Sequence, residues 1–314
     1  MNLTARDLIL ALICAFLGSV KGLLVSQVKS IGPIEIFGLR SVGATCFILP
    51  IVVFWNYKLW YDYKCNIILF IRAIIGNIAV CSYYFGFVYL PIAEASLLFY
   101  STPIFTVFIG YLFLNERCGL SEIISIFFSL LGIVLVSLPD FTFDTTRDSA
   151  STIKGVAGSI IGAIAQAAAL AIVRKITFVP PAVVSFWWAL VGIPFSGILT
   201  SIQFEHSQLW QCGFEVWCII LIAVVGFISE LCLVAALKST DAVIISIALT
   251  SEILWAFVLQ IYVNREIPNL MCVLGGLAIL FSIALPPIAG CVFKKKNTIE
   301  TEEDSIYRVN GSNK

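Results

Sequence analysis

Long apolar runs are the feature that most constrains the fold of this chain. A membrane-spanning helix needs roughly 20 apolar residues, and runs of about this length recur along the sequence between short polar breaks. We therefore expect an all-α polytopic membrane protein with ten transmembrane helices. The predicted spans lie near residues 8–28, 33–54, 67–89, 91–114, 120–138, 153–173, 182–202, 214–236, 242–262 and 270–292.

The composition agrees with a membrane protein and excludes several other classes. Hydrophobic residues make up 60% of the 314 residues and charged residues only 12%, against about 25% charged residues in soluble domains. The net charge of +0 gives no basis for binding nucleic acid. The ten cysteines form no C-x-x-C pair, and the single histidine, His206, has no partners nearby in the sequence. We therefore predict no metal site and no cofactor.

Positive charge predicts how the chain is oriented. Ten spans place both termini on one side, and the segments on that side hold twelve lysines and arginines against four on the other. Lysine and arginine are enriched in cytoplasmic loops, so both termini are predicted to be cytosolic. The sequence does not separate the plasma membrane from the endomembranes.

A polar stretch at residues 140–152 divides the chain into two halves that resemble each other. "YLPIAEASLLF" from Tyr89 can be laid on "ALKSTDAVIIS" from Ala236, which places Glu94 opposite Asp241. Five helices per half would turn the second half upside down, the inverted repeat common in secondary transporters. The predicted organisation is a first repeat at 1–139, a polar loop at 140–152, a second repeat at 153–293 and a disordered cytosolic tail at 294–314.

Three stretches resemble the EamA repeat of the drug/metabolite transporter superfamily. They are "IEIFGLR" (34–40), the run from "IRAIIGN" to "YLFLNE" (71–116) and "ILWAFVLQIYVNREIPNLMCVLGG" (253–276). Within that superfamily the chain is most similar to subfamily G of solute carrier family 35. The resemblance implies two inverted five-helix repeats and alternating access around a central cavity. In the second repeat, no proline stands where Pro103 would map.

Charged side chains inside the predicted spans are the main candidates for binding a solute. Each costs at least about 2.5–3.5 kcal/mol at the centre of a bilayer, so such residues usually face protein or water. Arg72 shares a helical face with Gly76, Ala79 and Tyr83, which suits a cavity wall; snorkelling to the interface is the alternative. Glu252 could couple a cation or proton, or form a structural pair. The predicted substrate-binding residues are Arg72, Lys21, Tyr83, Gln166, Glu252 and Trp255.

A second set of residues is predicted to act in gating or in structure. Pro91 is expected to reverse the chain between the third and fourth spans, with Glu94 complementing the next helix dipole. Pro103 frees a backbone carbonyl one turn earlier, where a kink could serve as a hinge. Glu35 and Arg40 are about 140° apart on one helix and are expected to find separate partners on other helices. The predicted gating or structural residues are Glu35, Arg40, Glu94, Pro91 and Pro103.

These features predict a secondary-active transporter or exchanger of a small polar organic solute. Three interior basic residues make an organic anion plausible, while four interior glutamates leave cations and zwitterions open. A coupling ion or counter-substrate is a possible partner. A homodimer in the lipid bilayer is also possible. The alternative is a non-transporting membrane protein that acts through a partner protein. No hydrolase or nucleotide-binding motif is present in the sequence, so we predict that the protein is not an enzyme.

Overall fold

The computed structural model describes residues 5–28, 31–90, 92–114, 119–137, 149–203, 213–264, 270–271 and 273–289, and every regular element in these ranges is helical. The helices are α1 (Ala5–Gln27), α2 (Pro33–Phe54), α3 (Tyr63–Tyr89), α4 (Ile92–Phe99), α5 (Thr102–Ile109), the π-helix η1 (Gly110–Leu114), α6 (Leu120–Ser137), α7 (Ser149–Lys175), α8 (Pro181–Gln203), α9 (Phe214–Ala236), α10 (Ala242–Leu249) and α11 (Ser251–Asn264). A further apolar helix covers Val273–Ala289.

Eight segments of the described chain are long and apolar enough to cross a membrane, and each overlaps a predicted span. Two more apolar helices, Leu120–Leu135 and Val273–Ala289, match the other two predicted spans but are shorter. Both fall below the roughly 20 residues that cross a bilayer unaided. The chain is therefore a polytopic helical membrane protein, and ten crossings stay a prediction.

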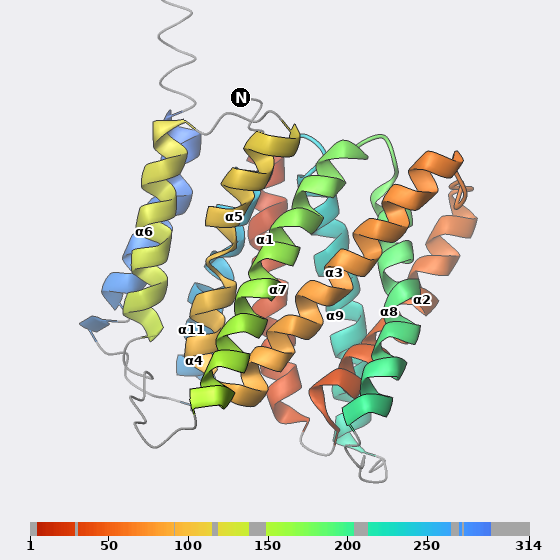
Figure 1. Cartoon of the computed structure of the whole chain (residues 1–314), viewed down its shortest axis with the longest axis horizontal. Helices are drawn as coiled ribbons and strands as arrows, with labels where there is room; N and C mark the ends of the chain where they lie inside the picture. The colour runs from red at the N-terminus through yellow and green to blue at the C-terminus, as the bar shows by residue number, and fades with distance from the viewer. Residues whose placement is uncertain are drawn as a thin grey trace, which may run out of the picture.

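The helices of the two halves pack on each other in a reciprocal pattern. The first helix of each half packs on the third helix of the other, α1 against α9 and α7 against α3, and the second helices, α2 and α8, pack together. Figure 1 shows α6 beside the blue C-terminal helix at one edge of the bundle. There the rings of Phe128 and Phe281 lie 4.8 Å apart.

Small residues allow the closest of these contacts, between α3 and α7. A Cβ built on Gly162 would lie 3.1 Å from the carbonyl oxygen of Ala79, and one on Gly158 would lie 2.9 Å from the ring of Phe85. The sequence Gly158-x-x-x-Gly162 therefore serves helix packing, as small residues commonly do in membranes.

Two spans are interrupted near their middle. The fourth consists of α4 and α5, separated at Tyr100 and Ser101, and the ninth consists of α10 and α11, separated at Thr250. At both breaks hydroxyl side chains donate to carbonyls three residues earlier: Ser101 to Leu98, Thr102 to Phe99, Thr250 to Ile247 and Ser251 to Ala248. Such bonds satisfy backbone carbonyls that a break would leave open.

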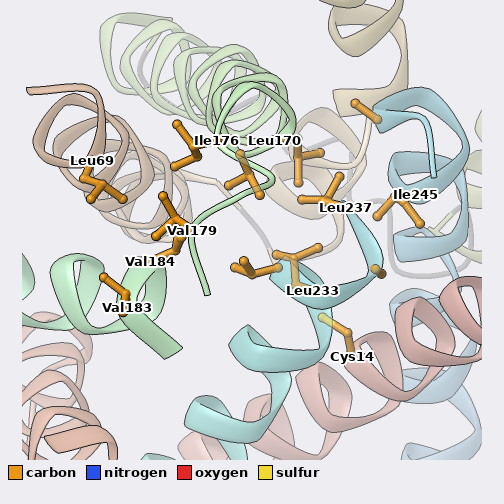
Figure 2. Packing of buried hydrophobic residues seen from close by; sticks show 14 of the residues in the cluster. Cys14, Leu69, Leu170, Ile176, Val179, Val183, Val184, Leu233, Leu237 and Ile245 are labelled. Carbon is orange, nitrogen blue, oxygen red and sulfur yellow. The ribbon is translucent and has the colours of Figure 1, made fainter. Parts of the chain in front are cut away.

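Buried aliphatic side chains join the helices at one end of the bundle. Figure 2 shows Leu69 of α3, Leu170 of α7, Val183 of α8, Leu233 of α9 and Ile245 of α10 meeting in one cluster. The turn between α7 and α8 adds further members to this cluster. Lipid supplies no hydrophobic driving force between helices, so this dense packing is a main source of their association.

Candidate functional site

The interior of the bundle holds a cluster of opposite charges on three helices. Lys21 comes from α1, Arg40 from α2 and Glu252 from α11, and the charges of both basic groups act on the carboxylate. Lys21 and Arg40 also act on each other as like charges. Protein surrounds Lys21 and Glu252, yet both keep some accessible surface. The cluster therefore contains charged side chains that a polar solute could contact.

The carboxyl group of Glu252 lies directly over Gly18 of α1. A Cβ at Gly18 would lie 2.5 Å from the Cδ of Glu252, so only glycine leaves room for the acid there. The neighbouring Ser19 hydroxyl donates a 2.6 Å hydrogen bond to the backbone carbonyl of Glu252. This bond and the missing Cβ fix where α11 crosses α1.

A chain of hydroxyl groups extends from the carboxylate into the first half of the protein. The hydroxyl group of Tyr100, at the break between α4 and α5, lies close enough to act on both Glu252 and Tyr83. The hydroxyl groups of Tyr83 and Ser96 lie 2.9 Å apart. The ring of Tyr83 stacks on Phe99 with centroids 4.1 Å apart. The break in the fourth span therefore places the hydroxyl group of Tyr100 close to Glu252 of the ninth span.

Arg40 is held by an aromatic ring and a glycine. Its guanidinium carbon lies 4.7 Å from the centroid of Trp188 on α8, which is within the range of a cation–π contact. A Cβ at Gly226 of α9 would lie 2.6 Å from the Nε of Arg40. This buried Nε has no hydrogen-bond partner among the described residues, so it remains available as a donor.

Arg72 takes part in a second charge pair. It lies nine residues after the start of α3 and forms an ion pair with Glu230, six residues before the end of α9. Both side chains are largely buried, with 5% and 13% of their surfaces exposed. The Nε and Nη1 atoms of Arg72 are buried without a partner in the described part of the chain. Arg72 is thus neutralised by Glu230 while Lys21 and Arg40 face Glu252.

The other predicted residues are distributed around these groups. Trp255 packs edge-on against Phe16 of α1, with ring centroids 5.3 Å apart, and its buried Nε1 has no partner in the described ranges. Gln166 is half-buried on α7, one turn after Gly162. Pro103 is the second residue of α5 and is buried.

Three further predictions fall elsewhere. Glu35 lies in the first turn of α2 and lines a groove between α2 and α8 with Gly38 and Ser196. Pro91 and the side chain of Glu94 lie outside the described residues.

Sequence reasoning missed several members of the site. Glu230 is not among the residues predicted for the site, and Tyr100 and Gly18 carry no motif of their own. Their roles come from the ion pair of Glu230 with Arg72 and from the closeness of Tyr100 and Gly18 to Glu252 in the fold. Within the described residues, no group of three or more His, Cys, Asp or Glu side chains could hold a metal ion.

This fold, with ionisable groups buried between helices, is that of a polytopic membrane protein with a polar interior. The model of the EamA-like transporter family matches residues 6–138 and 153–286. The chain therefore belongs to the EamA-like transporter family, with its domain present as two repeats.

Individual proteins agree with this assignment. Solute carrier family 35 member G1 of Mus musculus is 29% identical over 274 residues, which cover 85% of this chain and 74% of that protein. The pseudopaline exporter CntI of Pseudomonas aeruginosa is 22% identical over 289 residues, covering 89% of this chain and 95% of the exporter. One solved crystal structure has a TM-score of 0.77 at 16% identity and covers 91% of this chain and 98% of its own, which shows the fold alone.

Proposed function

We propose that this protein is a secondary-active transporter or exchanger of a small polar organic solute, with organic anions as its preferred class. The observation that carries the proposal is the cluster of Lys21 and Arg40 around the single carboxylate of Glu252, beside two broken helices. Broken helices with buried polar groups are common at the binding sites of secondary transporters. The names of its relatives, a solute carrier and an exporter, support transport as the activity.

The charge balance supports an anion. The two interior groups together hold three basic residues, Lys21, Arg40 and Arg72, against Glu230 and Glu252, which leaves one positive charge. Glu230 pairs with Arg72 and its charge also acts on Lys21, so the two neighbouring groups share this excess. The Nε of Arg40 has no hydrogen-bond partner among the described residues, so it could donate a hydrogen bond to the carboxylate of a bound anion.

Alternating access by two inverted repeats is the mechanism we propose. Asp7, near the start of α1, accepts a 3.0 Å hydrogen bond from Thr240, and Arg174, near the end of α7, pairs with Asp241 at 3.1 Å. The first helices of the two halves thus run in opposite directions, in support of an inverted relation. The reciprocal packing of the halves and a broken span in each support it further. Both termini are proposed to face the cytosol.

A counterflow experiment tests the proposed function. Proteoliposomes are preloaded with di- and tricarboxylates, nucleotides, amino acids or amines, and uptake of the matching labelled compound is followed. We expect carboxylates to exchange well above protein-free liposomes, with little exchange of amines. If folded, inserted protein exchanges none of these compounds, the transporter proposal is wrong. Exchange of amines in place of carboxylates would reject the anion class alone.

A further inference from the structure

We propose that Glu252 binds a proton together with the transported anion, so that the protein works as a proton–anion symporter. This inference rests on the proposed function and names its driving ion.

The first step is the competition between Glu252 and an anion for the same cations. Lys21 and Arg40 are the basic groups that act on Glu252, and they are also the groups that an anion would approach. With Glu252 ionised, an incoming carboxylate meets a like charge inside a medium of low dielectric constant, where repulsion is strong. Protonation of Glu252 removes that charge and leaves both cations to the anion. Anion binding and proton binding are therefore mutually favourable, and such coupling is reciprocal.

The second step is that Glu252 cannot easily leave the cluster. Its carboxyl group fits over Gly18, and Ser19 holds its backbone carbonyl at 2.6 Å. A carboxylate fixed in this way can relieve the repulsion by taking up a proton more readily than by swinging out. The proton comes from the aqueous phase, binds a carboxyl oxygen and returns to water when the anion leaves on the other side.

The third step is that the neighbours of Glu252 leave it the most suitable proton acceptor. Neither α10 nor Val273–Ala289 carries a titratable residue. The titratable or charged groups that act on Glu252 from the packed elements are Lys21 and Cys14 of α1, Arg40 of α2, Tyr83 and Tyr84 of α3 and Tyr100 of the α4–α5 break. Of these, Tyr100 offers a hydroxyl donor to the carboxylate, and donation to a carboxylate favours its ionised form. Glu252 is the carboxyl group among them, whereas Glu230 of α9, which also acts on Lys21 and Cys14, is held in the ion pair with Arg72.

The test uses proteoliposomes with a trapped pH-sensitive dye and a pool of labelled succinate, malate and glutarate. Counterflow at equal pH measures exchange alone. Net uptake with acid outside, at a membrane potential clamped to zero, measures coupling. We expect a gradient of one pH unit to drive about tenfold accumulation for one proton per anion, with acidification of the lumen. In Glu252→Gln we expect the gradient effect and the acidification to disappear, so that any uptake that remains no longer responds to the pH gradient.

Control variants keep the inference open to refutation. Glu122→Gln removes a buried carboxylate at the start of α6, outside the cluster, and should keep full coupling. Tyr100→Phe removes the donor to the ionised acid, so the pH midpoint of stimulation should move to higher pH. If Glu252→Gln exchanges no anion, infrared titration of the purified wild type and variant shows whether Glu252 takes up a proton. The wild type should then show a carboxyl group protonating on acidification that the variant lacks.

The outcomes separate the two proposals. Wild-type protein that gives no counterflow overturns the proposed function. Counterflow that ignores the pH gradient overturns the proton inference alone. Coupling that survives in Glu252→Gln also overturns it, because another group would then carry the proton.

Discussion

The carboxyl group of Glu252 occupies the space that a side chain at Gly18 would fill. A Cβ there would lie 2.5 Å from Cδ and within 2.7 Å of both carboxyl oxygens. The main acid of the candidate site is thus positioned by the absence of a side chain on the helix opposite. Because this contact joins α1 to α11, it links one helix of each repeat at the site.

Gly18→Ala tests this contact. The added methyl group forces the carboxyl group away from α1, so we expect a loss of stability of about 1–3 kcal/mol from overpacking and a marked loss of anion counterflow. Gly22, one turn further along α1, has no atom within 4 Å of a built Cβ. Gly22→Ala is therefore the matched control and should keep both stability and transport. Equal effects of the two substitutions would show that Gly18 has no special role.

The buried pair of Arg72 and Glu230 gives a second prediction. Removing one partner of a buried pair leaves a charge without compensation and typically costs about 3–5 kcal/mol. Arg72→Gln should therefore lower the free energy of unfolding in detergent more than the double variant Arg72→Gln/Glu230→Gln does. Arg174→Gln removes a more accessible pair with Asp241 at the end of the bundle and should cost less. Additive effects of the two single substitutions at 72 and 230 would contradict a direct pair.

Pro103 gives a prediction about motion. It is the second residue of α5, directly after the break, and it lacks the N–H that a continuous helix would need. Pro103→Ala lets α4 and α5 join more easily, so the transport rate should fall several-fold while the concentration of anion for half-maximal exchange changes little. Pro50, inside α2 and exposed, provides the control. A faster or unchanged rate in Pro103→Ala would argue against a hinge at this position.

The close contact of α3 and α7 gives a prediction about assembly. Gly162→Leu places a large side chain against the Ala79 carbonyl and the ring of Phe99, where a Cβ alone would lie within 3.2 Å. We expect the variant to aggregate or to unfold at lower temperature in detergent. Gly197 on α8 has open space around it, so Gly197→Leu should be tolerated. A fully stable Gly162→Leu would mean that the two helices can move apart.

Hydropathy predicted the helices of this fold well because the bilayer imposes a minimum length of apolar sequence. The breaks were harder to predict. Pro103 marks the one between α4 and α5, but no proline marks the one at Thr250 in the second repeat. There the hydroxyls of Thr250 and Ser251 bond to carbonyls one turn earlier, a device that leaves no obvious mark in an apolar run.

The candidate site was only partly predictable for a related reason. The cost of charge in a membrane singles out Lys21, Arg40 and Glu252 as interior residues, and the structure brings these three together. Their partners depend on which helices pack side by side, and hydropathy carries no information about that packing. Glu230 therefore acquires its role only from the ion pair that joins α9 to Arg72 of α3, and Gly18 from the packing of α11 on α1.

Anion counterflow by Lys21→Met tests the proposed anion site directly. Methionine keeps much of the length and apolar volume of the lysine stem but removes its charge, while Lys58→Met removes an exposed lysine outside the cluster. We predict carboxylate exchange by the wild type and by Lys58→Met, and a loss of at least about tenfold in Lys21→Met, which corresponds to about 1.4 kcal/mol of binding free energy. Exchange by correctly folded Lys21→Met at the wild-type rate would contradict an anion site at this cluster.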